Sequence, residues 1–326
     1  MNPTGYRRLI ALQLLSVPAM MALSFHTGCS AQSQDEVATV SAEGRTLREG
    51  VLACDPTAPF GQPSVVSIGP HRDGGTRTIP GDKTSARLTL DETTIYIDTQ
   101  YQNESSKGAW DLVTGQRSSN TTFAQATWLQ GLNSPQADRW PSISDDNLTL
   151  VFASDRNQPG TSRIFLSKRS STSAPFGLPQ EISGLPPGSL DSPYLRGNEL
   201  WFQAPNGNGD IYRAPLTNGT AGQVTPVTEF NTSDSEISPV LSADGLVAFF
   251  GSSQSISDGG TDAGPPRFRI WTASRKSTSD RFPLPTLVAE LMSSADQWPT
   301  WLSSDGCRLY FVSARGGAQL VYVAAR

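Results

Sequence analysis

The feature that most constrains this chain is an internal repeat of about fifty residues. Four segments share one pattern: DRWPSISDDNLTLVFASDR from Asp138, DSPYLRGNELWFQA from Asp191, DSEISPVLSADGLVAFFGS from Asp234 and DQWPTWLSSDGCRLYFVSAR from Asp296. A weaker copy, SARLTLDETTIYIDT, begins at Ser85. Self-similarity at roughly this period is typical of solenoids, propellers and repeat arrays. The chain is therefore expected to fold as five like modules.

Within each copy, the residue types indicate β-strands joined by tight turns. The central strand residues are Ile97, Phe152, Phe202, Phe250 and Phe311, so successive copies lie 48 to 61 residues apart. Six residues before them stand Asp91, Asp146, Arg196, Asp244 and Asp305, usually followed by Gly or Asn. These pairs tolerate the positive φ of a hairpin turn. A β-branched or aromatic pair then indicates a third strand, and a phrase like FGxP begins a fourth.

The phase of the repeat predicts an all-β propeller that is closed by its own N-terminal strand. The last copy has no fourth strand after it, whereas Phe60-Gly-Gln-Pro and the strand SVVSI precede the first copy. We therefore expect five four-stranded blades, with the N-terminal strand completing the C-terminal blade. Six blades is the alternative, but the two dozen or so residues between Phe60 and Ser85 are too few for three further strands of about five residues each.

The repeat resembles that of the TolB-like (WD40-like) β-propeller family. The shared pattern is Asp, Pro, Ser, Asp-Gly, an aromatic strand, Ser-x-Arg and Ile-Tyr, and its Ser-x-Arg element is matched at residues 154–156 and 313–315. The resemblance covers residues 60–326 and implies a propeller, often a six-bladed one in that family. It implies little about activity, because propellers have many unrelated functions.

The N-terminal residues have the features of an export signal. A pair of arginines precedes an apolar run, and the run ends in His26-Thr-Gly-Cys29. This sequence resembles the lipobox of bacterial lipoprotein precursors, with His26 in place of the usual Leu or Val. We therefore expect residues 1–28 to be a lipoprotein signal peptide and Cys29 to be the lipid attachment site. The alternative is an uncleaved transmembrane anchor.

Location and domain organisation follow from this interpretation. More than one acyl chain on Cys29 gives stable anchoring, and Ser30 resembles the sorting pattern for the outer membrane, on its periplasmic or cell-surface face. Residues 29–52 are small and polar, which predicts a flexible tether, and residues 53–326 are assigned to the propeller. The net charge of -5 and the pI near 5.1 give no basic footprint for nucleic acid.

Two cysteines remain if Cys29 is lipidated. When the N-terminal strand joins the last blade, Cys54 comes close to the turn that holds Cys307. We therefore hypothesise a Cys54–Cys307 disulfide that fastens the ends of the ring, in a compartment that permits disulfides. The alternative is two separate thiols.

Residues that could support catalysis are scarce. The chain has two histidines, and one of them lies in the predicted signal peptide. A histidine triad or a multi-histidine metal site is therefore not expected. No phosphate-binding GxxxxGK and no dinucleotide-binding GxGxxG is present. We expect no cofactor, no metal, no catalytic residue and no enzyme activity.

A candidate binding surface lies where the inner strands begin, near one mouth of the propeller channel. Its residues are Asp138, Trp140, Asp191, Asp234, Asp296 and Trp298. The tryptophans could stack on a sugar or anchor a peptide; the alternative is that they pack between blades, as is favoured for Trp301. The regular recurrence of the acids favours a structural role, and no carboxylate pair that breaks the repeat is evident.

These observations predict an exported, membrane-anchored lipoprotein whose propeller binds a protein or glycan partner in the cell envelope, as a monomer. A carbohydrate-active enzyme of the five-bladed propeller type is one alternative. A structural surface protein without a dedicated ligand is another.

Overall fold

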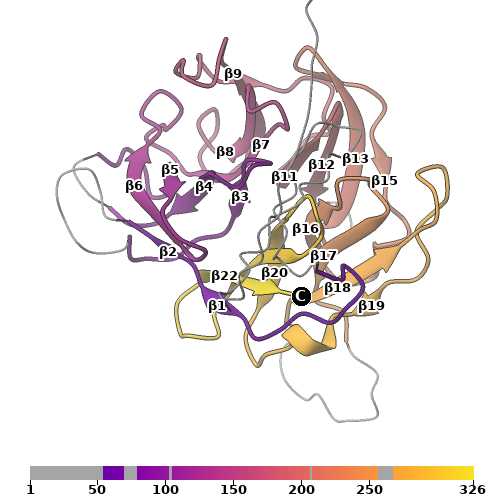
Figure 1. Cartoon of the computed structure of the whole chain (residues 1–326). Helices are drawn as coiled ribbons and strands as arrows, with labels where there is room; N and C mark the ends of the chain where they lie inside the picture. The colour runs from indigo at the N-terminus through magenta and orange to yellow at the C-terminus, as the bar shows by residue number, and fades with distance from the viewer. Residues whose placement is uncertain (1–53, 70–78, 103–104, 206–207, 256–266) are drawn as a thin grey trace, which may run out of the picture. The chain divides into compact units, whose positions relative to one another are not determined.

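Five antiparallel sheets follow one another in chain order around a common centre (Figure 1). The computed structural model describes residues 54–69, 79–102, 105–205, 208–255 and 267–326. The predicted signal peptide, Cys29 and the predicted tether lie outside the described residues. No helix in the described part of the chain is long and apolar enough to cross a membrane.

Each sheet is one blade with its first strand innermost. Blade 1 contains β3 (Ala86–Leu88), β4 (Thr94–Thr99), β5 (Asp111–Arg117) and β6 (Thr122–Trp128). Blade 2 contains β7 (Asp138–Ile143), β8 (Thr149–Ser154), β9 (Arg163–Lys168) and β10 (Gln180–Glu181). Blade 3 contains β11 (Asp191–Arg196), β12 (Glu199–Ala204) and β13 (Asp210–Thr217), with β14 (Thr220–Ala221) and β15 (Thr225–Pro226) both paired to β13.

The remaining two blades complete the ring. Blade 4 contains β16 (Glu236–Leu241), β17 (Val247–Ser252), β18 (Arg269–Ser274) and β19 (Thr286–Leu287), and a short 3-10 helix, Ala289–Leu291, follows it. Blade 5 contains β20 (Gln297–Leu302), β21 (Arg308–Ser313), β22 (Leu320–Ala325) and β1 (Ser64–Val65). The predicted five-bladed, four-stranded propeller is confirmed, and the six-bladed alternative is not observed.

The central strand residues of the repeat form the core of the blades. All five lie in the second strand of their blade and are 0% exposed: Ile97, Phe152, Phe202, Phe250 and Phe311. Burying a large apolar side chain contributes about 1.5–3 kcal/mol, so these positions explain why the aromatic character of the repeat recurs.

The N-terminal segment closes the ring by pairing with two blades. In blade 5, β1 runs antiparallel to β22, with Ser64 opposite Val323 and Val65 opposite Tyr322. The next strand, β2 (Ser67–Ile68), pairs in parallel with β6 at the outer edge of blade 1. The sequence predicted the first pairing but not the second. The segment thus connects the first and last blades across the seam.

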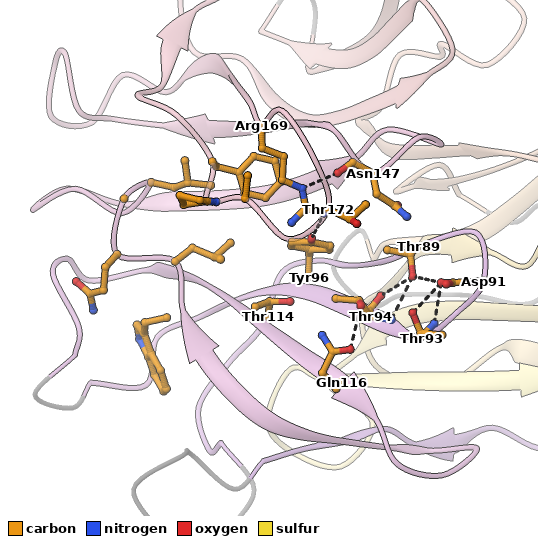
Figure 2. Close-up of a pocket in the computed structure, with 18 residues that line it drawn as sticks. Thr89, Asp91, Thr93, Thr94, Tyr96, Thr114, Gln116, Asn147, Arg169 and Thr172 are labelled. Carbon is orange, nitrogen blue, oxygen red and sulfur yellow. Dashed lines mark hydrogen bonds between the residues drawn. The ribbon is translucent and has the colours of Figure 1, made fainter.

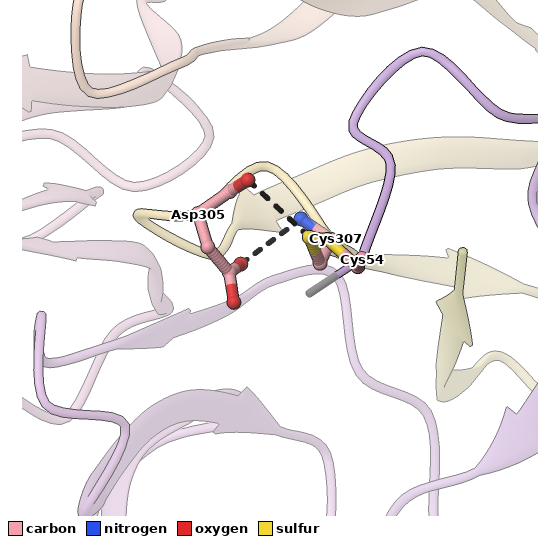
Figure 3. A group of neighbouring side chains, drawn as sticks. All are labelled: Cys54, Asp305 and Cys307. Atoms are coloured by element: carbon pink, nitrogen blue, oxygen red, sulfur yellow. Dashed lines mark hydrogen bonds between the residues drawn. A yellow bond between two sulfur atoms is a disulfide. The ribbon is translucent and has the colours of Figure 1, made fainter. Parts of the chain in front are cut away.

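A disulfide between Cys54 and Cys307 reinforces this seam (Figure 3). The two Cα atoms are 6.1 Å apart, within the usual range for a disulfide. Cys307 lies in the turn between β20 and β21, where its backbone N–H donates to Asp305 Oδ1 at 3.0 Å. The hypothesised pairing is the one that the structure contains, and it joins residues 253 positions apart in the chain.

The turn between the first and second strands of each blade has one residue with positive φ. These residues are Glu92, Asn147, Gly197, Gly245 and Gly306, with φ between 54° and 74°. In four blades the preceding Asp stabilises the turn. Asp146 Oδ1, for example, accepts hydrogen bonds from Ser144 Oγ at 2.6 Å and Leu148 N–H at 2.9 Å. The end of the propeller that carries these turns is called the turn face below, and the opposite end, where the first strands begin, the start face.

A recurring arginine after the third strand connects this turn to the fourth strand. Its Nε donates to the carbonyl of the positive-φ residue at 2.6–3.0 Å in four blades, from Arg117, Arg169, Arg275 and Arg326. Its guanidinium lies 4.3–4.6 Å from the ring centroid of Phe123, Phe176, Phe282 or Phe60. The arginine and FGxP elements of the repeat are therefore explained by a cation–π contact that positions the outer strand.

Candidate functional site

The acids at the start face are mostly structural. Asp138 is fully buried, accepts from Ser134 N–H and Oγ, and is paired with Arg156 at 2.6 Å. The equivalent first-strand positions of blades 4 and 5 are occupied by Glu236 and Gln297. A shared hydrogen bond indicates the equivalence: each side chain, like that of Asp138, accepts from the hydroxyl of the residue four positions earlier. Asp234 and Asp296, which the repeat pattern grouped with Asp138, lie two residues and one residue before these positions. A binding role for them stays a prediction.

The two tryptophans of the predicted binding surface lie close to each other, although they come from different blades. Trp140 from blade 2 and Trp298 from blade 5 have ring centroids 6.0 Å apart. The two residues are only 8% and 6% exposed, and Trp298 Nε1–H donates to the Thr84 carbonyl at 2.8 Å. Trp301 is also buried and packs edge-on against Tyr310. Little of these rings is open to a ligand, and a binding role for Trp140 and Trp298 stays a prediction.

One carboxylate pair at the start face breaks the repeat. Asp155 follows β8 in blade 2, Asp191 begins β11 in blade 3, and Arg139 Nη2 lies 3.9 Å and 4.0 Å from their Oδ1 atoms. Both Oδ1 atoms are buried and lack a hydrogen-bond partner among the described residues. Burial raises the pKa of Asp191; the positive charge of Arg139 opposes this effect, and the negative charge of Asp155 adds to it. Asp191 was among the candidate site residues predicted from the sequence, whereas Asp155 and Arg139 were not.

A groove between blades 1 and 2 has the largest volume of the three inter-blade grooves compared here (Figure 2). Its volume is about 560 Å³, against about 330 Å³ between blades 3 and 4 and about 260 Å³ between blades 2 and 3. Strands β4, β5 and β6 of blade 1, the turn before β4 and the residues after β6 form one wall. Blade 2 contributes Asn147, Arg169, Thr172 and residues 174–176 to the other. No sequence motif marks this groove, because its residues come from five separate segments.

The groove is lined mainly by neutral hydrogen-bonding groups. They are the side chains of Thr93, Thr94, Thr114, Thr172, Gln116, Gln130 and Asn147. Apolar surface is added by the partly exposed Phe176, whose ring packs edge-on against Tyr96 at 6.4 Å, whereas Trp128 also lines the groove but is only 3% exposed. A ligand here would meet hydroxyl, amide and aromatic groups together.

The two charged groups of the groove already have protein partners. Asp91 Oδ1 accepts from the hydroxyls of Thr89 and Thr93, and although burial acts the other way, these hydrogen bonds lower the pKa of Asp91. Arg169 donates to the Asn147 carbonyl at 2.8 Å and stacks on Phe176. The groove therefore presents little free charge to a ligand.

Comparisons with known proteins identify the fold and no family. No family model and no curated protein matches the chain. TolB from Acinetobacter baumannii is 17% identical, with a TM-score of 0.43 over 78% of this chain and 58% of that one, so this chain matches less than two thirds of TolB. A candidate glycosidase from Bacteroides thetaiotaomicron is 8% identical, with a TM-score of 0.50 over 76% and 87%. A glycosyl hydrolase from Bacteroides ovatus is 11% identical, with a TM-score of 0.47 over 75% and 84%.

These similarities bear on two expectations. The predicted five-bladed propeller is confirmed by the five sheets of the described residues. TolB proteins are among the solved structures to which this chain is similar. The expectation that the chain is not an enzyme has to be corrected, because a structural neighbour named as a glycosidase, with a TM-score of 0.50, has the same kind of fold, so the fold gives no ground for excluding enzyme activity. The repeat symmetry had been taken as evidence against catalysis, yet the acid pair at Arg139 breaks that symmetry.

Proposed function

We propose that this chain is an exported propeller lipoprotein, anchored through Cys29, whose groove between blades 1 and 2 binds a neutral glycan of the cell envelope. The neutral lining of the groove is the observation that carries the proposal. Hydroxyl and amide side chains can both donate to and accept from sugar hydroxyls, and aromatic rings pack against the apolar faces of sugar rings. A volume of about 560 Å³ suits a small oligosaccharide.

A matched pair of variants tests this proposal. Residues 171–173 of blade 2 and 277–279 of blade 4 have the same sequence, Ser-Thr-Ser, and each pair of flanking serines shares a hydrogen bond. Thr172→Val removes a hydroxyl from the blade 1–2 groove, and Thr278→Val removes its equivalent from the smaller groove. Neither change alters a buried contact, since both residues are exposed.

Binding is measured with full-length protein on an array of neutral envelope glycans, followed by calorimetry on the best glycan. We expect Thr172→Val and Gln116→Ala to weaken binding by about 5- to 10-fold each, the usual effect of losing one hydrogen bond of about 1 kcal/mol. Thr278→Val should bind as the wild type does. Equal affinities in all four proteins, or no glycan bound at all, would refute the assignment of this groove.

A second candidate function, glycoside hydrolysis at the start face, is favoured by Asp155 and Asp191. Two carboxyl groups, one of them with a raised pKa, are the arrangement that most glycosidases use as acid and base or nucleophile. Burial raises the pKa of Asp191, which suits the acid role, and leaves Asp155 for the second role. Glycan turnover should fall by more than about 100-fold in Asp155→Asn and Asp191→Asn, but not in Asp234→Asn, whose carboxylate has no ion pair among the described residues. Turnover that is unchanged in both variants would rule out the pair.

A further inference from the structure

A second groove, of about 330 Å³, lies between blades 3 and 4 and differs in charge from the groove of blades 1 and 2. The loop after a third strand lines both, with Thr278 and Phe282 in one groove and Thr172 and Phe176 in the other. Two charged side chains line the groove of blades 1 and 2. Five line the groove of blades 3 and 4: Arg213, Arg275, Arg281, Glu229 and Asp280.

Two of these arginines do not recur in the repeat. Arg213 lies in β13 opposite Trp201, the residue just before the central strand residue. The corresponding third-strand residues of the other four blades are uncharged: Thr114, Leu166, Thr272 and Val323. Arg281 stands directly before Phe282, whereas Thr122, Pro175 and Pro59 precede the equivalent phenylalanines. The architecture of a blade therefore requires neither arginine.

Both of these arginines have donors that are open to a ligand. The side chain of Arg213 is 42% exposed, and its Nη1 donates to Glu199 Oε1 at 3.3 Å. Its Nε and Nη2 atoms have no hydrogen-bond partner among the described residues. Arg281 is 86% exposed, and its Nε lies 3.9 Å from Glu229 Oε1. Exposed ion pairs of this kind contribute about 0–1 kcal/mol, so they compete weakly with an anionic ligand.

Arg275 brings a third guanidinium, held in place by the fold. Its Nε and Nη1 donate to the carbonyls of Gly245 and Asp280, both at 3.0 Å, and it stacks on Phe282 at 4.3 Å. Burial lowers the pKa of Arg275, and among the surrounding charges that of Arg213 has the largest effect, in the same direction. Arg213 and Arg275 are therefore close enough to repel each other, and an anion between them would relieve this repulsion.

The rest of the lining suits a sugar with one negative charge. Three arginines against two acids leave an excess of one positive charge. The hydroxyls of Thr225, Thr228 and Thr278 also line the groove, and such groups can donate to and accept from sugar hydroxyls. A volume of about 330 Å³ suits a single sugar residue.

We propose that the groove of blades 3 and 4 binds the carboxylate of an acidic sugar, with Arg213 and Arg275 donating to its oxygens and the exposed Arg281 beside them. Guanidinium groups match the planar carboxylate and form charge-assisted hydrogen bonds with it. The groove is a different one from that of blades 1 and 2, and its ligand is charged. Either proposal can therefore fail without the other.

The test uses full-length protein, with galacturonate as the probe and galactose as its neutral counterpart. Calorimetry compares the wild type, Arg213→Gln and the matched control Lys168→Gln, which removes one positive charge from the groove of blades 2 and 3. We expect the wild type and Lys168→Gln to bind galacturonate more tightly than galactose. Arg213→Gln should lose at least about 10-fold in galacturonate affinity, the effect of one charge-assisted hydrogen bond.

A second variant and a second ligand sharpen the result. Arg281→Gln changes a side chain that is 86% exposed, so it should fold as the wild type does and weaken galacturonate binding by about 3-fold. Thermal unfolding checks that Arg213→Gln is folded. Tighter binding of galactose 1-phosphate, lost in Arg213→Gln, would identify phosphate as the anion and overturn the carboxylate. Galacturonate that is not bound, is bound no better than galactose, or is bound equally by Arg213→Gln and Lys168→Gln would overturn the site.

Discussion

Arg156 and Arg315 occupy equivalent positions in two blades, and comparing them isolates the effect of one buried negative charge. Arg156 and Arg315 make the same contacts in blades 2 and 5: a serine Oγ, a leucine carbonyl and the side chain at the first position of the inner strand. The last contact is 2.6 Å long in both, but it is made to Asp138 in blade 2 and to Gln297 in blade 5. Both guanidiniums also stack on two aromatic rings at 4.8–5.2 Å. The two sites differ mainly in one negative charge.

The charge of Asp138 determines how much each arginine substitution should lower the free energy of unfolding. Arg156→Ala leaves the fully buried Asp138 carboxylate without its cation, and breaking a buried pair in this way costs about 3–5 kcal/mol. Arg315→Ala leaves a neutral amide, so the loss is that of ordinary hydrogen bonds and packing, about 1–2 kcal/mol. We expect the free energy of unfolding to fall by about 2 kcal/mol more in Arg156→Ala than in Arg315→Ala.

Urea unfolding followed by tryptophan fluorescence measures this difference. The double variant Arg156→Ala with Asp138→Asn serves as the control, because it removes the charge together with its partner and should recover most of the additional loss. Equal destabilisation by the two arginine substitutions would show that the charge of Asp138 contributes nothing, and the interpretation of the repeat arginine as a counter-ion would have to be abandoned.

Three further predictions concern the seam, a buried acid and the anchor. Replacing Cys54 and Cys307 by Ser should lower the free energy of unfolding by up to about 5 kcal/mol in the chain-entropy model for a 253-residue loop, and a reductant should do the same to the wild type but nothing to the variant. Burial raises the pKa of Glu236, so its charged form is unfavourable and wild-type stability should fall as the pH rises above the ordinary glutamate range. Glu236→Gln should therefore be more stable at pH 7 and lose this advantage in acid, as unfolding at pH 4 and pH 7 can show. Cys29→Ser should abolish incorporation of labelled palmitate and shift the protein from the membrane fraction to the soluble one.

The fold was predictable because the repeat constrains it at several levels. The phase of the copies required an outer strand for the last blade, and the only unassigned strand pattern was at the N-terminus. Pairing of β1 with β22 follows from that count. The parallel pairing of β2 with β6 could not be predicted, since a two-residue strand has no periodicity and its register depends on where the chain leaves blade 5.

The candidate sites were harder to predict, because they depend on the apposition of blades. Asp155 is part of the Ser-Asp-Arg motif and was treated as a repeat residue, although blade 5 has Ala314 at that position. That difference between blades 2 and 5 was the sequence feature that could have marked Asp155 as a candidate site residue.

In this propeller, residues that recur in most blades differ in their contacts from features that are found in only one or two blades. Residues that recur in most blades have partners within the fold: the turn acids bind hydroxyls and amides, and the recurring arginines stack on aromatic rings. Three features do not recur in this way: the large volume of the groove between blades 1 and 2, the acid pair of blades 2 and 3, and the arginine-lined groove of blades 3 and 4. Blade 5 instead carries the closing strand and the disulfide. We expect substitutions that affect ligands to map to blades 1–4 and those that affect closure of the ring to map to blade 5.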